Sequence, residues 1–113
     1  MKILIAGSRS IEEFDFSPLI PKDTTLIISG GAKGIDALAE KYADKHKISK
    51  LILLPQYNLY GKAAPLKRNE MMVDIADMVI VVWDGRSRGT KYTLQYATKK
   101  NKNIMLVTVM KKQ

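Results

Sequence analysis

The sequence predicts an α/β fold: a single Rossmann-like, three-layer domain with a five-stranded parallel sheet over residues 1–113. Five short apolar runs lack the alternation of a half-exposed strand, which is typical of parallel strands covered on both faces. Helical or turn-rich segments separate these runs, and regular alternation of strands and helices indicates a parallel sheet flanked by helices. With right-handed crossovers, we expect the strand order 3-2-1-4-5.

The expected strands are the apolar runs at residues 3–6, 26–28, 51–54, 78–83 and 104–109. The first run leads into GSRS, the second into SGG, the third stops at a proline and the fourth leads into DG. Gly, Ser, Asp and Pro favour turns, so they mark where these strands end.

Three segments between the runs have the periodicity of a helix with one apolar face. The residues that support these helices are Ile35, Leu38, Ala39, Tyr42 and Ala43 in the first, Leu66, Met71, Met72, Val73 and Ala76 in the second, and Thr93, Leu94 and Ala97 in the third. Residues 11–20 differ, because Pro18 and Pro21 limit this segment to a short helix or a loop.

Composition excludes several classes of site. The chain has no cysteine, which excludes disulfides, thiolate metal sites and a cysteine nucleophile. His46 is the only histidine, so a histidine metal site or a Ser-His pair is not expected, and we predict neither a metal nor a cofactor. The apolar runs are too short to span a bilayer and the N-terminus does not read as a signal peptide. We therefore expect a cytoplasmic protein without a membrane partner.

Four loops are expected at the carboxyl-terminal edge of the sheet, where open parallel sheets bind ligands. They read GSRS, SGGAKG, PQYNLYGKAAP and WDGRSRGT. In the second loop, glycines let the backbone approach a ligand, and free N–H groups at the following helix start favour an anion. The fourth loop repeats this chemistry. The alternative is that tight strand-to-helix turns need glycine in any case. Neither loop is a Walker A or GxGxxG motif.

The candidate ligand-binding residues lie in three of these loops and in the helices that follow the second and third loops: Gly7, Ser8, Arg9, Ser29, Gly30, Gly31, Lys33, Gly34, Asp36, Arg68, Asp84, Gly85, Ser87, Arg88, Gly89 and Thr90. Some have alternative interpretations. Asp36 either contacts a ribose or offsets its helix dipole. Asp84 either accepts from a ligand hydroxyl or forms a turn. Tyr57 and Tyr60 either stack on a base or anchor their loop, and Trp83 is expected in the core rather than in a pocket wall.

The formal net charge of +8 suggests an anionic partner. Position supports this, because several basic residues fall at the ligand edge or at helix starts, where the dipole disfavours them. They are Arg9, Lys33, Lys62, Lys67, Arg68, Arg86, Arg88 and Lys91. The lysines near helix C-termini, together with Lys111 and Lys112, are interpreted as solvated surface.

Three stretches together resemble the SLOG superfamily: SGGAKGIDALAEKYA, PLKRNEMMVDIADMVIVVWDG and SRGTKYTLQYA. This group joins the DNA-processing protein A (Smf) family to the LOG family of cytokinin-activating phosphoribohydrolases. The resemblance covers nearly the whole chain and is closest to small, stand-alone bacterial SLOG proteins of unestablished function. It adds Asn69, in the stretch RNEMM, to the candidate ligand-binding residues.

The resemblance to each family is incomplete. The DNA-processing proteins are similar at SGGAKGID and RNEMM and bind single-stranded DNA, but their arginine in the first motif is Lys33 here. The LOG enzymes are similar around Arg68 and carry PGGxGTxxE. Gly89 and Thr90 match that motif, whereas Thr93 stands at the glutamate position and Trp83 at the proline position. The phosphoribohydrolase reaction is therefore not expected, and no catalytic residue is assigned.

We expect the chain to bind a nucleotide or nucleotide-derived phosphorylated ligand, as a sensor or as a nucleotide-processing enzyme. The alternative is a single-stranded nucleic-acid module. A third hypothesis is a scaffold that forms a homodimer through the helices around residues 66–76 and 93–97, with apolar contacts from Met71, Met72, Tyr92 and Tyr96.

Overall fold

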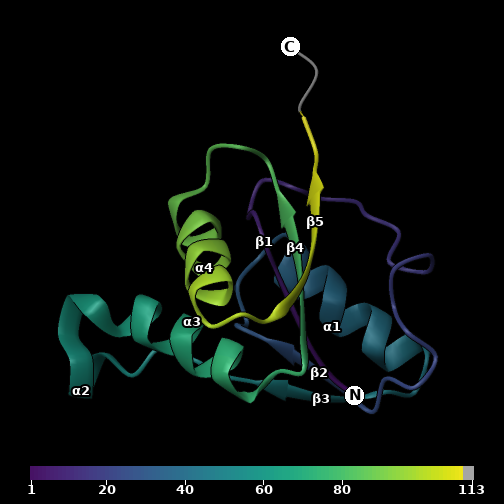
Figure 1. The fold of residues 1–113 in the computed structure, drawn as a ribbon, viewed down its shortest axis with the longest axis horizontal. Helices are drawn as coiled ribbons and strands as arrows, with labels where there is room; N and C mark the ends of the chain where they lie inside the picture. The colour runs from purple at the N-terminus through teal and green to yellow at the C-terminus, as the bar shows by residue number, and fades with distance from the viewer. Residues whose placement is uncertain (111–113) are drawn as a thin grey trace.

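Five parallel strands form one sheet in the order β3-β2-β1-β4-β5, which confirms the predicted topology (Figure 1). The computed structural model describes residues 1–110, so Lys111 and Lys112 lie outside the described residues. In chain order, the strands are β1 (Lys2–Gly7), β2 (Leu26–Ser29), β3 (Ser49–Ile52), β4 (Met78–Trp83) and β5 (Asn103–Thr108).

Helices cover both faces of the sheet, with α1 on one side and α3 and α4 on the other (Figure 1). Their bounds are α1 (Ile35–Lys45), α3 (Ala64–Ile75) and α4 (Arg88–Lys99). A short helix, α2 (Tyr57–Tyr60), and a 3-10 turn, η1 (Gly61–Ala63), precede α3. All three predicted helices are therefore present.

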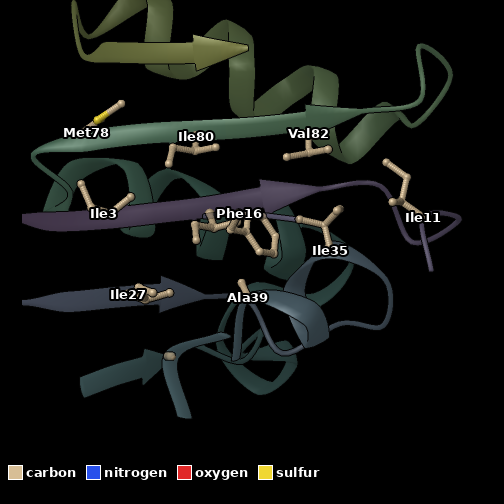
Figure 2. Close-up of a cluster of buried hydrophobic side chains, with 11 residues drawn as sticks. Ile3, Ile11, Phe16, Ile27, Ile35, Ala39, Met78, Ile80 and Val82 are labelled. Atoms are coloured by element: carbon tan, nitrogen blue, oxygen red, sulfur yellow. The ribbon is translucent and has the colours of Figure 1, made fainter. Parts of the chain in front are cut away.

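Successive residues of β1 point to opposite faces and enter two separate cores. Ile3 and Ile5 pack with α1, whereas Leu4 packs with α3 and α4. Residues 11–20 form a loop, the second of the two alternatives, and this loop supplies Phe16 to the α1 core, where its ring is 2% exposed. Figure 2 shows the Phe16 ring between Ile3 and Ile35.

The edge strands are less covered than the apolar runs predicted. All four residues of β3 are exposed, with Leu51 and Ile52 at 37% and 38%, and β5 is also partly exposed. The expectation that every strand is covered on both faces is therefore wrong for β3. The strand also lies at residues 49–52 rather than 51–54. The helices pack mainly over the central strands, so an edge strand keeps apolar side chains in contact with solvent.

The topology places three strand ends next to one another. Since β1 lies between β2 and β4 and all are parallel, the loops after these strands meet at one rim of the sheet. The order of the strands reverses between β1 and β4, which is where such sheets bind ligands. No helix within residues 1–110 is long and apolar enough to cross a membrane.

Candidate ligand-binding site

Ser8, in the loop after β1, joins the loops at this rim to one another. It is fully buried and its backbone N–H donates to the Val82 carbonyl at 3.1 Å. Its hydroxyl accepts from the Asp84 N–H at 3.0 Å, and its carbonyl accepts from the Ile35 N–H at 3.3 Å. Ser8 therefore fixes the spacing of the three loops, and its N–H and carbonyl are already used within the protein.

The first glycine loop is tied down by the protein's own side chains. The Gly31 N–H donates to Ser29 Oγ at 3.3 Å, and the Ala32 N–H donates to Asp36 Oδ2 at 3.2 Å. Ser29 is fully buried and its hydroxyl donates to Glu40 Oε2 at 2.9 Å. The expectation that the amides of this loop are free for an anion is therefore wrong for Gly31.

Two glycines of this loop have different local roles: Gly34 is required by the backbone, and Gly30 leaves space for two side chains. Gly34 has φ of 77°, and a Cβ there would lie 2.5 Å from the Ser8 carbonyl oxygen. At Gly30, a Cβ would lie 2.9 Å from Asp36 Oδ2 and 3.0 Å from Arg68 Nη1. Gly34 lets α1 approach the loop after β1. Gly30 leaves room at the rim for the side chains of Asp36 and Arg68.

Asp84 organises the loop after β4. Its Oδ1 accepts from the N–H groups of Arg86 and Ser87 at 2.8 and 2.9 Å, and its Oδ2 accepts from the Ser10 hydroxyl at 2.8 Å. Desolvation by itself would raise the pKa of Asp84, but these hydrogen bonds outweigh it and hold the pKa well below its usual range. The carboxylate shapes a turn, which agrees with the turn-forming alternative.

The N-terminus of α4 retains free donors. Its first bond back to the preceding loop is from the Lys91 N–H to the Ser87 carbonyl, and no side chain caps the helix. Within the described residues, no acceptor lies on the N–H groups of Gly89 and Thr90, as is usual for a first helical turn. These two amides, rather than those of the first glycine loop, carry the positive end of a dipole toward the rim.

Arg68 reaches the rim from α3. Its Nη1 donates to the carbonyls of Gly30 and Leu53 at 2.6 and 3.2 Å, and its Nε donates to Asn69 Oδ1 at 2.8 Å. Burial lowers the pKa of Arg68, and the Asp36 carboxylate partly offsets this effect. The guanidinium still remains charged at neutral pH. Its Nη2 makes no hydrogen bond to residues 1–110, which leaves one end of the fork for a ligand.

Asp36 and Asn69 each keep one polar atom without a protein partner among the described residues. Both are 8% exposed. Asp36 uses Oδ2 to accept from Ala32, and Asn69 uses Oδ1 to accept from Arg68, which leaves Asp36 Oδ1 and Asn69 Nδ2. Burial raises the pKa of Asp36, although the nearby positive charges of Arg68 and Arg9 oppose this. The two side chains offer a ligand an acceptor and a donor.

These groups line one cavity of about 360 Å³, which we call the rim cavity. Its size is within the usual range for a small-molecule site. The predicted residues that line it are Gly7, Arg9, Asp36, Arg68, Asn69, Asp84, Ser87, Gly89 and Thr90. The predicted residues outside its lining are Ser8, Ser29, Gly30, Gly31, Lys33, Gly34, Gly85 and Arg88. Of these, Lys33 and Gly34 line a separate surface hollow beside Arg9.

Sequence reasoning did not assign several lining residues to the site: Ala6, Ser10, Ala32, Pro65, Leu66, Met72 and Thr93. Two of these had a usable signal. Ser10 follows Arg9 in the same loop, and Thr93 lies one helical turn after Thr90, so both share a surface with a predicted residue. The others are apolar and give no chemical signal.

Contacts between α3 and α4 hold the two halves of the rim cavity together. The Tyr92 hydroxyl donates to the Glu70 carboxylate, and the Tyr96 hydroxyl donates to Asp74 at 2.9 Å. Met72 is 3% exposed, whereas Met71 is 42% exposed. Met72, Tyr92 and Tyr96 thus make contacts within the chain, Met71 stays exposed, and the homodimer remains a prediction.

Comparisons with protein-family models, curated protein sequences and solved structures found no match for this chain. The SLOG resemblance accordingly rests on the sequence motifs. The fold itself is a Rossmann-like parallel sheet of order 3-2-1-4-5.

Proposed function

We propose that this chain is a SLOG-like domain that binds a nucleotide or a nucleotide-derived phosphorylated ligand in the rim cavity. One observation carries the proposal: the cavity joins two arginines and the free amides of a helix N-terminus to two buried side chains with unpartnered polar atoms. The arginines and the helix amides suit a phosphate, and the two buried polar side chains suit the hydroxyls of a sugar.

Each group has a role in this proposal. The phosphate oxygens accept from the N–H groups of Gly89 and Thr90 and pair with Arg9, which is exposed and lines the cavity. Arg68 donates from Nη2 to the phosphate or to the sugar. Asp36 Oδ1 accepts from a sugar hydroxyl and Asn69 Nδ2 donates to one.

The proposal assigns binding and no bond cleavage. Thr93 stands where the resemblance to LOG enzymes would place a glutamate, and its hydroxyl donates to the Gly89 carbonyl at 3.1 Å. A threonine cannot supply the negative charge that stabilises an oxocarbenium-like centre. A sensor or carrier of the ligand needs only the binding groups.

Thermal-shift measurements with mono-, di- and cyclic nucleotides at millimolar concentration test the proposal. Ligand at about 100 times its Kd adds about 2.7 kcal/mol to the free energy of unfolding, which is readily measured. The absence of stabilisation by any nucleotide in the panel would contradict the proposal.

Arg9→Ala and Arg88→Ala form a matched pair, because each removes one exposed positive charge and only Arg9 lines the rim cavity. We expect Arg9→Ala to weaken binding by about tenfold, as for loss of one charge-assisted hydrogen bond. Arg88→Ala should change the Kd by less than about twofold, since an exposed charge outside the site acts only at long range. Equal losses would show that binding depends on net charge and not on this cavity.

A second candidate is a single-stranded nucleic-acid module, which the exposure of two aromatic rings favours. Tyr57 and Tyr60 on α2 are 60% and 42% exposed, and the exposed Lys62 follows them. Such rings stack on bases without sequence preference. Fluorescence anisotropy with a labelled oligonucleotide should then show affinity that falls steeply with salt. No binding at low salt would eliminate this candidate.

A further inference from the structure

A second cavity, of about 470 Å³, lies between the end of β3 and α3, and we call it the side cavity. Its lining is largely apolar and includes Leu54, Tyr60 and Met71. Gln56 and Asn58 add two uncharged amides. Among residues 1–110, no acidic residue lines it, and Arg68 is the one charged residue that does.

Arg68 also lines the rim cavity, and among the described residues it is the one that lines both cavities. The side chain is held at this boundary by the Gly30 carbonyl, at the end of β2, and by the Leu53 carbonyl, beyond β3. A ligand that lies across Arg68 therefore reaches both cavities.

The surroundings of the side cavity are unusually apolar for a surface. Among residues 1–110, ten large hydrophobic side chains are exposed, and eight of them fall within residues 51–71. The side-cavity residues Leu54, Tyr60 and Met71 are 64%, 42% and 42% exposed. Exposed apolar surface concentrated around one cavity marks a binding site.

The chemistry of the two cavities differs in a way that matches the two ends of one nucleotide. The rim cavity contains the groups that bind phosphate and sugar. The side cavity has a tyrosine ring and aliphatic side chains, which contact the faces of a planar base, and amides, which donate to and accept from its edge.

We propose that the side cavity binds the base of the nucleotide whose sugar and phosphate lie in the rim cavity. This inference rests on the proposed function. The ligand class is then a nucleotide with an intact base, and a sugar phosphate fills only half of the site. Arg68 contacts the sugar between the two ends.

Calorimetric titration with ribose 5-phosphate and with the four ribonucleoside monophosphates tests the inference. At least one nucleotide should bind about tenfold more tightly than ribose 5-phosphate, because base stacking adds to phosphate binding. Tyr60→Ala should remove most of this difference and leave the affinity for ribose 5-phosphate unchanged. Leu59→Ala is the matched control, since Leu59 is exposed on the same short helix and does not line the side cavity.

The outcomes separate the inference from the proposed function. If ribose 5-phosphate binds and all four nucleotides bind no more tightly, the proposed function stands and the inference is wrong. If none of the five compounds binds and no nucleotide of the thermal-shift panel stabilises the protein, both are wrong. A dimer in sedimentation analysis that Leu54→Glu dissociates would show that a second copy covers this face, which also overturns the inference.

Discussion

Replacement of Gly34 by alanine tests whether the first glycine loop serves the fold. Gly34 adopts φ 77° and ψ −130°, a region that is essentially restricted to glycine and costs other residues about 1–3 kcal/mol. A Cβ would also lie 2.5 Å from the Ser8 carbonyl oxygen and 2.6 Å from Arg9 Cα, both backbone atoms. Such overpacking costs about 1–3 kcal/mol. Together these terms give a loss of about 2–6 kcal/mol, a large part of the stability of a small domain.

Gly89→Ala is the matched control in the second loop. A Cβ at Gly89 has no neighbour within 4 Å, and its φ is not positive. Thermal unfolding followed by circular dichroism should show little change in Tm for Gly89→Ala, whereas Gly34→Ala should lower Tm by about 8–25 °C. A loss of less than about 0.5 kcal/mol in Gly34→Ala, or an equal loss in both variants, would refute this account of the loop.

Two further predictions concern the core and the rim. Phe16→Ala should cost about 3–5 kcal/mol by urea unfolding, because its ring is 2% exposed, and the partly buried Phe14→Ala should cost clearly less. Equal costs would mean that this loop does not anchor the core. Burial raises the pKa of Asp36, so its contribution to stability is greatest when it is protonated and is lost as pH rises through that pKa. Asp36→Asn keeps the acceptor for Ala32 and should be more stable than the natural chain at neutral pH but not at about pH 3, where both side chains are neutral. If the free energies of unfolding of Asp36→Asn and the natural chain differed by the same amount at both pH values, burial would not raise the pKa of Asp36.

The central part of the fold follows from the sequence because burial and apolarity coincide there. β1 and β4 are covered on both faces, so their apolar runs mark them to within a residue or two. β3 was misplaced because it pairs only with β2, and its register, with Leu26 opposite Ser49, depends on backbone hydrogen bonds. An edge strand needs fewer apolar residues, so its composition does not mark where it begins.

The topology predicts that the loops after β1, β2 and β4 meet at one rim. It does not predict which backbone N–H groups of these loops are free. Strand ends and helix starts correctly brought Arg9, Asp36 and Thr90 to one cavity. Which N–H groups stay free depends on local side chains that compete with a ligand. Ser and Asp side chains can accept hydrogen bonds either from a ligand or from nearby backbone N–H groups, and the sequence does not distinguish the two. In the structure, Ser29 and Asp84 accept from the backbone.

The position of β1 at the centre of the sheet has a consequence for synthesis on the ribosome. Lys2 and Asp77 are tied by two hydrogen bonds across 75 residues, and β1 then pairs with β4 along its length. At about 5–20 residues per second, β1 waits roughly 4–15 s for this neighbour. During that time one edge of a strand that is apolar from Ile3 to Ala6 is open, and an open edge of this kind favours aggregation. β1 is made before the other four strands of this sheet and is thus among the last to be completed, and the nascent domain is most vulnerable until Trp83 has emerged.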